Sequence, residues 1–200
     1  MSRIAVLIPE FPGQTHSFFW REIEALASGH GIGVQIVSTR LAPKPVWHDW
    51  VEQAAAIQLY PVPKAELARL MPDLLAALPR LATDPDIRRI LRQPRAWAFV
   101  LMALRLARIC RTRGLSHLHV HSCANSALIA AFCHRISGIP YSLVLHGPLA
   151  DYGPEQPFKW KNARFVFVIT ETLRTEVARV MPEMMDKVSI VPMGVNIDLF

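Results

Sequence analysis

The sequence predicts an α/β protein built on a Rossmann-like, doubly wound parallel sheet that carries a helical insert. Short apolar segments alternate with segments of helical periodicity, which is the pattern of parallel α/β proteins. The first of them, Ile4 to Pro9, is apolar at nearly every position, as expected for a strand buried on both faces. Hydrophobic residues make up 52% of the 200 residues and charged residues only 19%, so the chain can bury one large core.

The first strand leads through a loop containing Gly13 to a helix that begins near Ser17. Three glycines then mark the end of this helix and a turn into a strand over residues 34–39: Gly29, Gly31 and Gly33. These glycines follow a helix, whereas a dinucleotide-binding fingerprint follows a strand, so we interpret them as a C-cap and turn. Residues 40–50 are expected to form a loop and residues 56–60 a third strand.

A helical insert is predicted over about residues 64–113. We expect several short helices, because proline interrupts helix interiors and four prolines divide the segment: Pro72, Pro79, Pro85 and Pro94. Eight arginines stand among its apolar residues: Arg88, Arg89, Arg92, Arg95, Arg105, Arg108, Arg111 and Arg113. Such basic amphipathic helices fit an anionic membrane surface, and they equally fit packing on the sheet with the arginines in water.

After the insert the alternation of strands and helices resumes. Strands are predicted at 118–121, 141–145, 165–169 and 188–191, with helices at 126–137 and 171–180. In open parallel sheets, ligands bind beyond the carboxyl ends of the strands. Functional residues are therefore expected in the segments that follow strands, which are residues 9–17, 121–125, 146–151 and 170–172.

Net charge, cysteine content and targeting signals limit the kinds of partner and the cellular compartment that we expect. The formal net charge of +6 favours anionic partners. Cys110, Cys123 and Cys133 form no CxxC pair, so we expect free thiols in a reducing compartment. No secretory signal is recognisable, and no apolar stretch reaches the ~20 residues of a membrane span. The sequence predicts a cytoplasmic protein, with any membrane contact peripheral on the inner face of the cytoplasmic membrane. It contains no recognisable nucleic-acid-binding module, and no nucleic acid partner is expected.

Four segments carry a family resemblance. Residues 187–200 read KVSIVPMGVNIDLF, which resembles the K(I/V)xVVPxGVDxxxF segment that ends the N-terminal domain of family 4 (group 1) glycosyltransferases. Residues 11–23 resemble the FPxxSETFIxxEI opening of the bacterial exopolysaccharide and colanic-acid type of that family, residues 117–121 its HIHAHF, and residues 139–147 its GIPYSxTxHA. The chain departs from these patterns at His16, Ser122 and Asn196, where the family has Glu, Phe and Asp.

The resemblance implies that residues 1–200 form the acceptor-side N-terminal half of a GT-B fold, in which residues 194–200 begin the linker to a donor domain that this chain lacks. It implies a hexosyltransferase-type, retaining transfer from a nucleotide-sugar (UDP- or GDP-sugar) to a polysaccharide or lipid-linked oligosaccharide acceptor. It also implies no tightly bound cofactor and no metal, and a chain that is inactive without the donor domain.

His146 is the expected catalytic residue, because it directly follows a strand and because a family histidine at this position reaches the transferred sugar and the acceptor. Its expected role is hydrogen bonding and charge stabilisation. The substrate-binding candidates are Gly13, Gln14, Thr15, His16, His121, Asn125, Gly147, Asp151 and Lys159. The Gly13 loop precedes a helix N-terminus, where backbone N–H groups can meet a phosphate. Glu22, within that helix, is interpreted as structural.

Two alternatives remain. His117, His119 and His121 alternate along a strand, so they project from one face and could share a metal. This segment also resembles the HxH opening of PHP-type metal-dependent phosphoesterases, but those enzymes carry it on their first strand, and here only two histidines follow it. No metal site is therefore predicted. The other alternative is a binding module that pairs with a separate donor domain.

Overall fold

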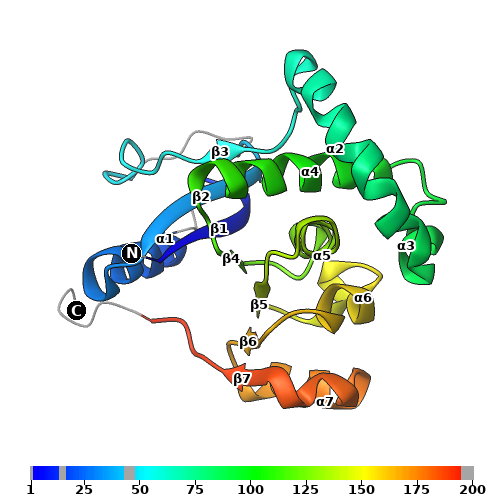
Figure 1. Ribbon diagram of the computed structural model, residues 1–200. Helices are drawn as coiled ribbons and strands as arrows, with labels where there is room; N and C mark the ends of the chain where they lie inside the picture. The colour runs from blue at the N-terminus through cyan, green and yellow to red at the C-terminus, as the bar shows by residue number, and fades with distance from the viewer. Residues whose placement is uncertain (1, 14–16, 43–47, 195–200) are drawn as a thin grey trace.

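The computed structural model describes residues 2–13, 17–42 and 48–194. Its parallel strands form one seven-stranded sheet in the order β3-β2-β1-β4-β5-β6-β7 (Figure 1). The strands are β1 (Arg3–Glu10), β2 (Gly33–Arg40), β3 (Ile57–Gln58), β4 (His117–Val120), β5 (Tyr141–Leu145), β6 (Val166–Val168) and β7 (Val188–Ile190). The predicted Rossmann-like parallel sheet is confirmed.

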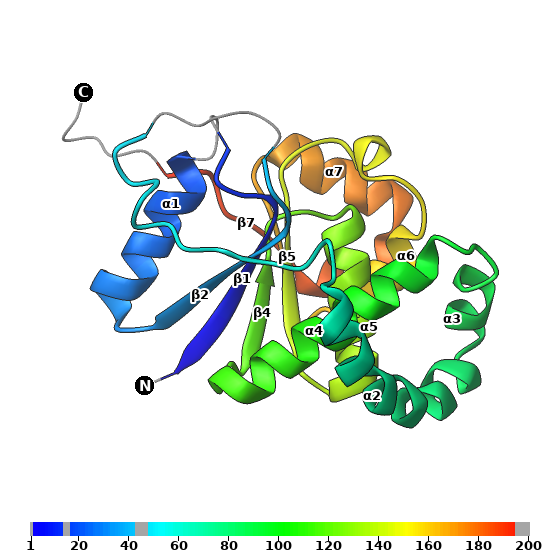
Figure 2. The ribbon, with the colours of Figure 1, turned by 90° about the horizontal axis from the view of Figure 1, so that it is seen from above.

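The helices cover the two faces of the sheet unequally. They are α1 (Ser17–Glu24), α2 (Lys64–Thr83), α3 (Pro85–Ile90), α4 (Ala96–Arg113), α5 (Asn125–Ser137), α6 (Gln156–Lys161) and α7 (Glu171–Val180), with short π and 3-10 turns η1 (Ala25–Gly29), η2 (Leu149–Tyr152) and η3 (Pro182–Lys187). Seen from above, α1 lies on one side of the sheet, and α4 and α5 lie on the other (Figure 2). The chain moves outward from β1 in both directions, and right-handed crossovers place the two sets of helices on opposite faces.

Each face of the sheet has its own core, because alternate residues of a strand point to opposite faces. Val6 and Ile8 of β1 pack with Phe19 and Ile23 of α1 in the smaller core. Their neighbours Ala5 and Leu7 belong to the larger core, which draws on all the helices from α2 to α7. The side of the sheet that carries α1 is therefore the thinly covered one, and this places the site described below.

The insert departs from the expectation of several short helices. Helix α2 runs for 20 residues through both Pro72 and Pro79. Its buried residues Leu70, Ala77 and Leu81 join the larger core, and this packing compensates for the local cost of the prolines. Pro85 and Pro94 do separate helices as expected. Within the described ranges, no helix is long and apolar enough to cross a membrane.

The end of the first helix and the segment between β5 and β6 add detail to the predicted elements. The first helix gives way to a π-turn over its last five residues, and Gly31 then has the positive φ of 61° that the predicted turn requires. Between β5 and β6, where only a loop was expected, the chain forms η2 and α6.

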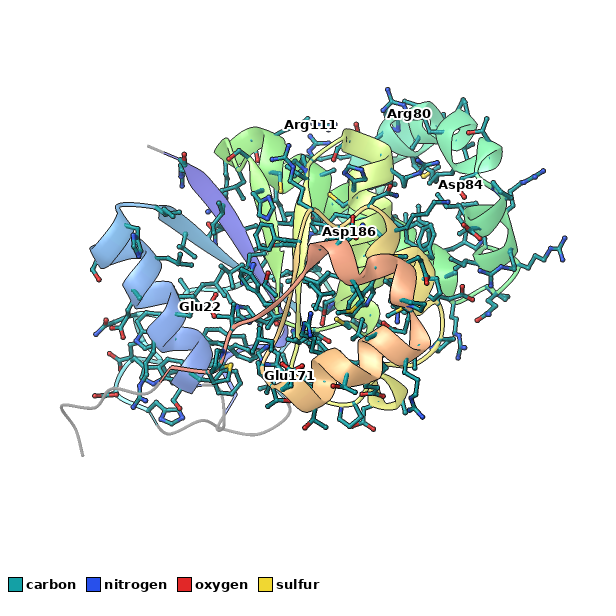
Figure 3. The ribbon with its side chains drawn as sticks, turned by 90° about the horizontal axis from the view of Figure 1, so that it is seen from below. Glu22, Arg80, Asp84, Arg111, Glu171 and Asp186 are labelled. Carbon is teal, nitrogen blue, oxygen red and sulfur yellow. The ribbon has the colours of Figure 1, made fainter. Side chains whose placement is uncertain are left out.

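Asp84 joins the insert to the sheet-covering helix α5, and it lies at the corner between α2 and α3 (Figure 3). Its Oδ1 accepts hydrogen bonds from the backbone N–H groups of Asp86 and Ile87 at 2.9 and 3.3 Å, which caps α3. Its Oδ2 accepts from the Arg135 guanidinium of α5 at 2.5 Å. The residue is 9% exposed, so both contacts are largely shielded from water.

We expect Asp84→Ala to lower the free energy of unfolding by about 2 kcal/mol, through loss of the cap and of the charge-assisted bond to Arg135. Urea unfolding followed by circular dichroism measures the change. Asp86→Ala is the matched control, since its two ion pairs are both 3.7 Å long and its side chain is 37% exposed; its effect should stay within about 0.5 kcal/mol. Equal effects of the two substitutions would contradict this account.

Candidate functional site

The ends of β4 and β5 bring two predicted site residues together. His121 follows β4 directly, and its backbone N–H donates to the Leu7 carbonyl of β1 at 3.0 Å. His146 follows the neighbouring strand β5. Because adjacent parallel strands end at the same edge of the sheet, His121 Nδ1 lies 3.3 Å from His146 Nε2. The sequence candidates at this edge thus form one cluster.

Glu22 reaches this cluster from α1. Its Oε1 lies 3.0 Å from His119 Nε2 and 3.5 Å from His121 Nε2. The neighbouring residue, Ile23, is buried in the core under α1, and Glu22 lies on the side of the helix toward the sheet (Figure 3). Sequence reasoning missed this role. The available signal was that Glu22 stands four residues after Phe18 and three after Phe19, and therefore on the same face of the helix.

The histidines of β4 have further partners on β5. His119 pairs with Ser142 in the sheet register, and Ser142 Oγ lies 2.8 Å from His119 Nδ1 and 2.9 Å from His117 Nε2. Ser142 is fully buried. The three alternating histidines do share one face of the sheet, as predicted, and the hydroxyl of Ser142 joins two of them.

Two aromatic rings of α1 cover the edge of the cluster. Phe18 and Phe19 have ring centroids 5.6 and 5.4 Å from that of His146, and Phe19 is 4.6 Å from His121. Burial, reinforced by neighbouring His121, lowers the pKa of His146 to about 4, so its imidazole is neutral at pH 7. Burial opposes ionisation of Glu22, but hydrogen bonds from His119 and His121 outweigh it and hold the pKa of that carboxyl well below its usual range. The site therefore combines a carboxylate with a neutral His146.

The loop after β5 is held by Gln156, a buried residue that the sequence did not single out. Its Nε2 donates to the carbonyls of Tyr152 and Gly153 at 3.0 and 2.9 Å, and lies 3.2 Å from the carbonyl of Cys123. The loops after β4 and β5 are thus tied together behind the histidines, which supports the position of His146.

One pocket borders the cluster, and another contains a predicted site residue. The first, of about 580 Å³, lies between α1 and the segment after β7, and Glu22 and His119 are among its lining residues. The second, of about 510 Å³, lies beyond the ends of β1 and β2 and includes the predicted residue Asn125 together with Arg95 and Phe99. Asn125 is therefore placed in a pocket of its own, separate from His146.

The remaining predicted residues fall into three groups. Gly147 and Asp151 follow His146 in the loop, and a Cβ added to Gly147 would come within 3.4 Å of the Tyr152 hydroxyl. Gly13 is buried at the end of the described part of its loop, and Gln14, Thr15 and His16 lie outside the described residues. Lys159 is 3% exposed and its ammonium donates to the Tyr152 carbonyl at 2.9 Å, so in this structure it braces the loop and lines neither pocket.

The model of the family described as Glycosyltransferase Family 4 matches residues 17–199. A comparison with curated proteins found no significant match. Among solved structures, sucrose-phosphate synthase from Thermosynechococcus elongatus is similar with a TM-score of 0.62 and 12% identity, over 100% of this chain and 50% of that one.

Two solved structures of UDP-GlcNAc 2-epimerase are also similar. The protein from Methanocaldococcus jannaschii has a TM-score of 0.53 and 12% identity, over 94% of this chain and 45% of that one. The protein from Neisseria meningitidis, bound to UDP-GlcNAc, has a TM-score of 0.53 and 13% identity, over 95% and 46%. The chain thus spans about half the length of these proteins, and the likeness confirms the fold class, a Rossmann-like domain that forms one half of a GT-B fold.

The buried ammonium of Lys159 makes stability depend on pH. Burial lowers its pKa from 10.5 to about 8, so between these values the unfolded chain binds more protons here than the folded chain, and the free energy of unfolding rises with pH. We expect this residue to contribute an increase of about 2 kcal/mol between pH 8 and pH 10, and Lys159→Met to remove it.

Urea unfolding of the unaltered chain and of Lys159→Met at pH 8 and pH 10 measures how the free energy of unfolding changes with pH in each protein. Other groups that titrate in this interval contribute equally to both proteins, so they cancel in the difference. Lys161→Met, on the same helix but with a side chain 61% exposed, is the control for loss of a lysine. An unchanged slope in Lys159→Met, or the same change in both variants, would refute the assignment.

Proposed function

Because the chain belongs to glycosyltransferase family 4, we propose that it is the acceptor-binding half of a retaining glycosyltransferase, which moves a sugar from a nucleotide-sugar to an exopolysaccharide-type or lipid-linked acceptor. One observation carries the proposal: Glu22, His121 and His146 form a connected chain that ends at the carboxyl edge of two adjacent strands. This edge is where open α/β sheets bind their ligands.

The contacts among Glu22, His121 and His146 favour one placement of their protons. The Glu22 carboxylate only accepts, so it favours the proton of His121 on Nε2, which leaves His121 Nδ1 to accept from His146 Nε2–H. His146 then keeps an unprotonated Nδ1, which can accept a hydrogen bond from an acceptor hydroxyl. In a retaining transfer the departing phosphate takes the proton of the attacking hydroxyl, so the hydroxyl bound by His146 is a neighbouring one on the acceptor sugar. This contact positions the attacking oxygen. Glu22 and His121 act as positioning residues.

The donor site belongs, in this proposal, to a second domain. The three solved structures compared above are each about twice as long as this chain, and one of them is bound to UDP-GlcNAc. We propose a UDP- or GDP-sugar as donor, and that the chain is inactive without the donor domain. The pocket that includes Asn125 and Arg95 suits an acceptor that combines sugar hydroxyls with phosphate, because one guanidinium group can bind two phosphate oxygens. Arg40, also in its lining, is paired with Glu10.

Sugar transfer tests this assignment. The chain, combined with a family 4 donor domain, is expected to release UDP or GDP from a panel of nucleotide-sugars when lipid-linked or polysaccharide acceptors are present. His146→Ala should reduce the rate by about 100-fold or more, since it removes the group that orients the hydroxyl. His30→Ala, at an exposed position after η1, is the control. Full activity of a folded His146→Ala protein would overturn the proposed role.

We also propose that the acceptor is met at the inner face of the cytoplasmic membrane. Helix α2 exposes four apolar side chains along one face: Leu67, Met71, Leu75 and Leu78. Arg88 and Arg92 of the insert are also exposed. Other arginines of the insert serve the fold instead, as Arg89 pairs with Glu155 and Arg105 with Glu66. The apolar stripe with its exposed cations is the composition of a helix that rests on anionic lipid.

Sedimentation with lipid vesicles measures this contact. We expect the chain to bind vesicles containing phosphatidylglycerol, and the double change Met71→Gln with Leu75→Gln to weaken binding by at least about fivefold, because it removes apolar area from the stripe. Val180→Gln alters a similarly exposed apolar residue on α7 and serves as the control. If the double variant binds as the unaltered chain does, α2 is not the lipid-binding surface.

A further inference from the structure

We propose that Glu22, His119 and His121 form a binding site for a zinc ion, which links α1 to β4. This inference goes beyond the proposed sugar transfer and does not depend on it. The sequence alone argued against a metal, because the residues after the HxH segment supplied too few ligands. The missing ligand comes instead from Glu22, about a hundred positions earlier in the chain, which the fold places over the two histidines.

The spacing of the three groups suits a small cation. A tetrahedral zinc ion with bonds of 2.0–2.1 Å to nitrogen and oxygen holds its ligand atoms about 3.4 Å apart. Glu22 Oε1 lies 3.0 Å from His119 Nε2 and 3.5 Å from His121 Nε2. One ligand atom from each of the three residues can be chosen so that all lie within 4.8 Å of one another. Small side-chain movements therefore suffice to bind the ion.

The hydrogen bonds around His119 and His121 can form both with and without a bound zinc ion. Metal-ligating histidines usually donate from their other ring nitrogen to a fixed partner. His119 Nδ1 has the Ser142 hydroxyl at 2.8 Å, and His121 Nδ1 has His146 Nε2 at 3.3 Å. A hydroxyl and a neutral imidazole can each either donate or accept. When zinc takes both Nε2 atoms, the protons move to Nδ1 and both hydrogen bonds persist with reversed direction. His146 then carries its proton on Nδ1, so the zinc-bound form differs from the form proposed for sugar transfer.

The ligand types favour zinc over the cations that prefer oxygen. Two imidazoles and one carboxylate match the His₂Glu set of zinc sites that keep a position open for water. Magnesium and calcium take mainly oxygen ligands. His119 and His121 are buried, while Glu22 and His119 line the pocket of about 580 Å³, from which a water molecule can supply the fourth ligand.

Zinc binding to the purified chain tests the site without any sugar substrate. After treatment with a chelator, the chain is titrated with ZnCl₂ by calorimetry, and bound metal is measured by elemental analysis after gel filtration. We expect one zinc per chain with a Kd below about 1 μM, and a higher melting temperature in its presence. With Co²⁺ as the probe, the visible absorption of a tetrahedral site should appear.

Variants identify the ligands. His119→Gln should raise the Kd by at least about 100-fold, and Ser142→Ala, which removes only an outer partner, by about 10-fold. Glu22→Gln keeps the shape of the side chain and lies on the partly exposed helix, so it stays informative if the buried histidine variants fail to fold. His30→Gln alters an exposed histidine outside the cluster and should bind as the unaltered protein does.

No stoichiometric zinc in the unaltered chain, or unchanged affinity in folded Glu22→Gln or His119→Gln, would overturn the proposal. Loss of sugar transfer in the His146→Ala protein with zinc binding retained would leave this site intact, so failures of the two proposals are distinguishable.

Discussion

The contact of the Glu22 carboxylate with His119 and His121 is the constraint on which the functional half of the molecule depends. Helix α1 is attached to its face of the sheet by the small core around Phe19 and Ile23, and the carboxylate fixes it at one position along β4. This position sets the two phenylalanine rings over His146. The same contact therefore helps to bury His121 and underlies the proton positions proposed for the histidines.

The unequal covering of the sheet explains why polar chemistry collects on one side. The face under α4 and α5 is closed by a large apolar core, in which a buried polar group would need a partner of its own. The opposite face carries His117, His119 and Ser142 in its middle, and they satisfy one another across β4 and β5. The histidine nitrogens on one face of the sheet can bind a ligand. The apolar side chains on the other face contribute only to the stability of the fold.

Much of this fold could be predicted from local patterns. In a parallel α/β protein the buried strands appear in the sequence as short apolar runs, and the connecting helices appear as segments of helical periodicity. The alternation of His117, His119 and His121 correctly placed three side chains on one face, and the strand-end rule brought His121 to His146. What failed depended on tertiary contacts. Continuity of α2 through Pro72 rests on packing against the core, and the place of Glu22 rests on the docking of α1, neither of which a local window contains.

Lys159 and Gln156 show how the loop after β5 is held. The family resemblance makes Lys159 a substrate-binding candidate, and in the structure its buried ammonium donates to the Tyr152 carbonyl. Gln156, an unremarkable amide in sequence, makes the contacts that join the loops after β4 and β5. Backbone carbonyls in a folded loop must find donors, and long polar side chains nearby supply them. The site at the sheet edge is therefore supported by buried polar residues of the neighbouring loops, and its precision depends on them as much as on the histidines.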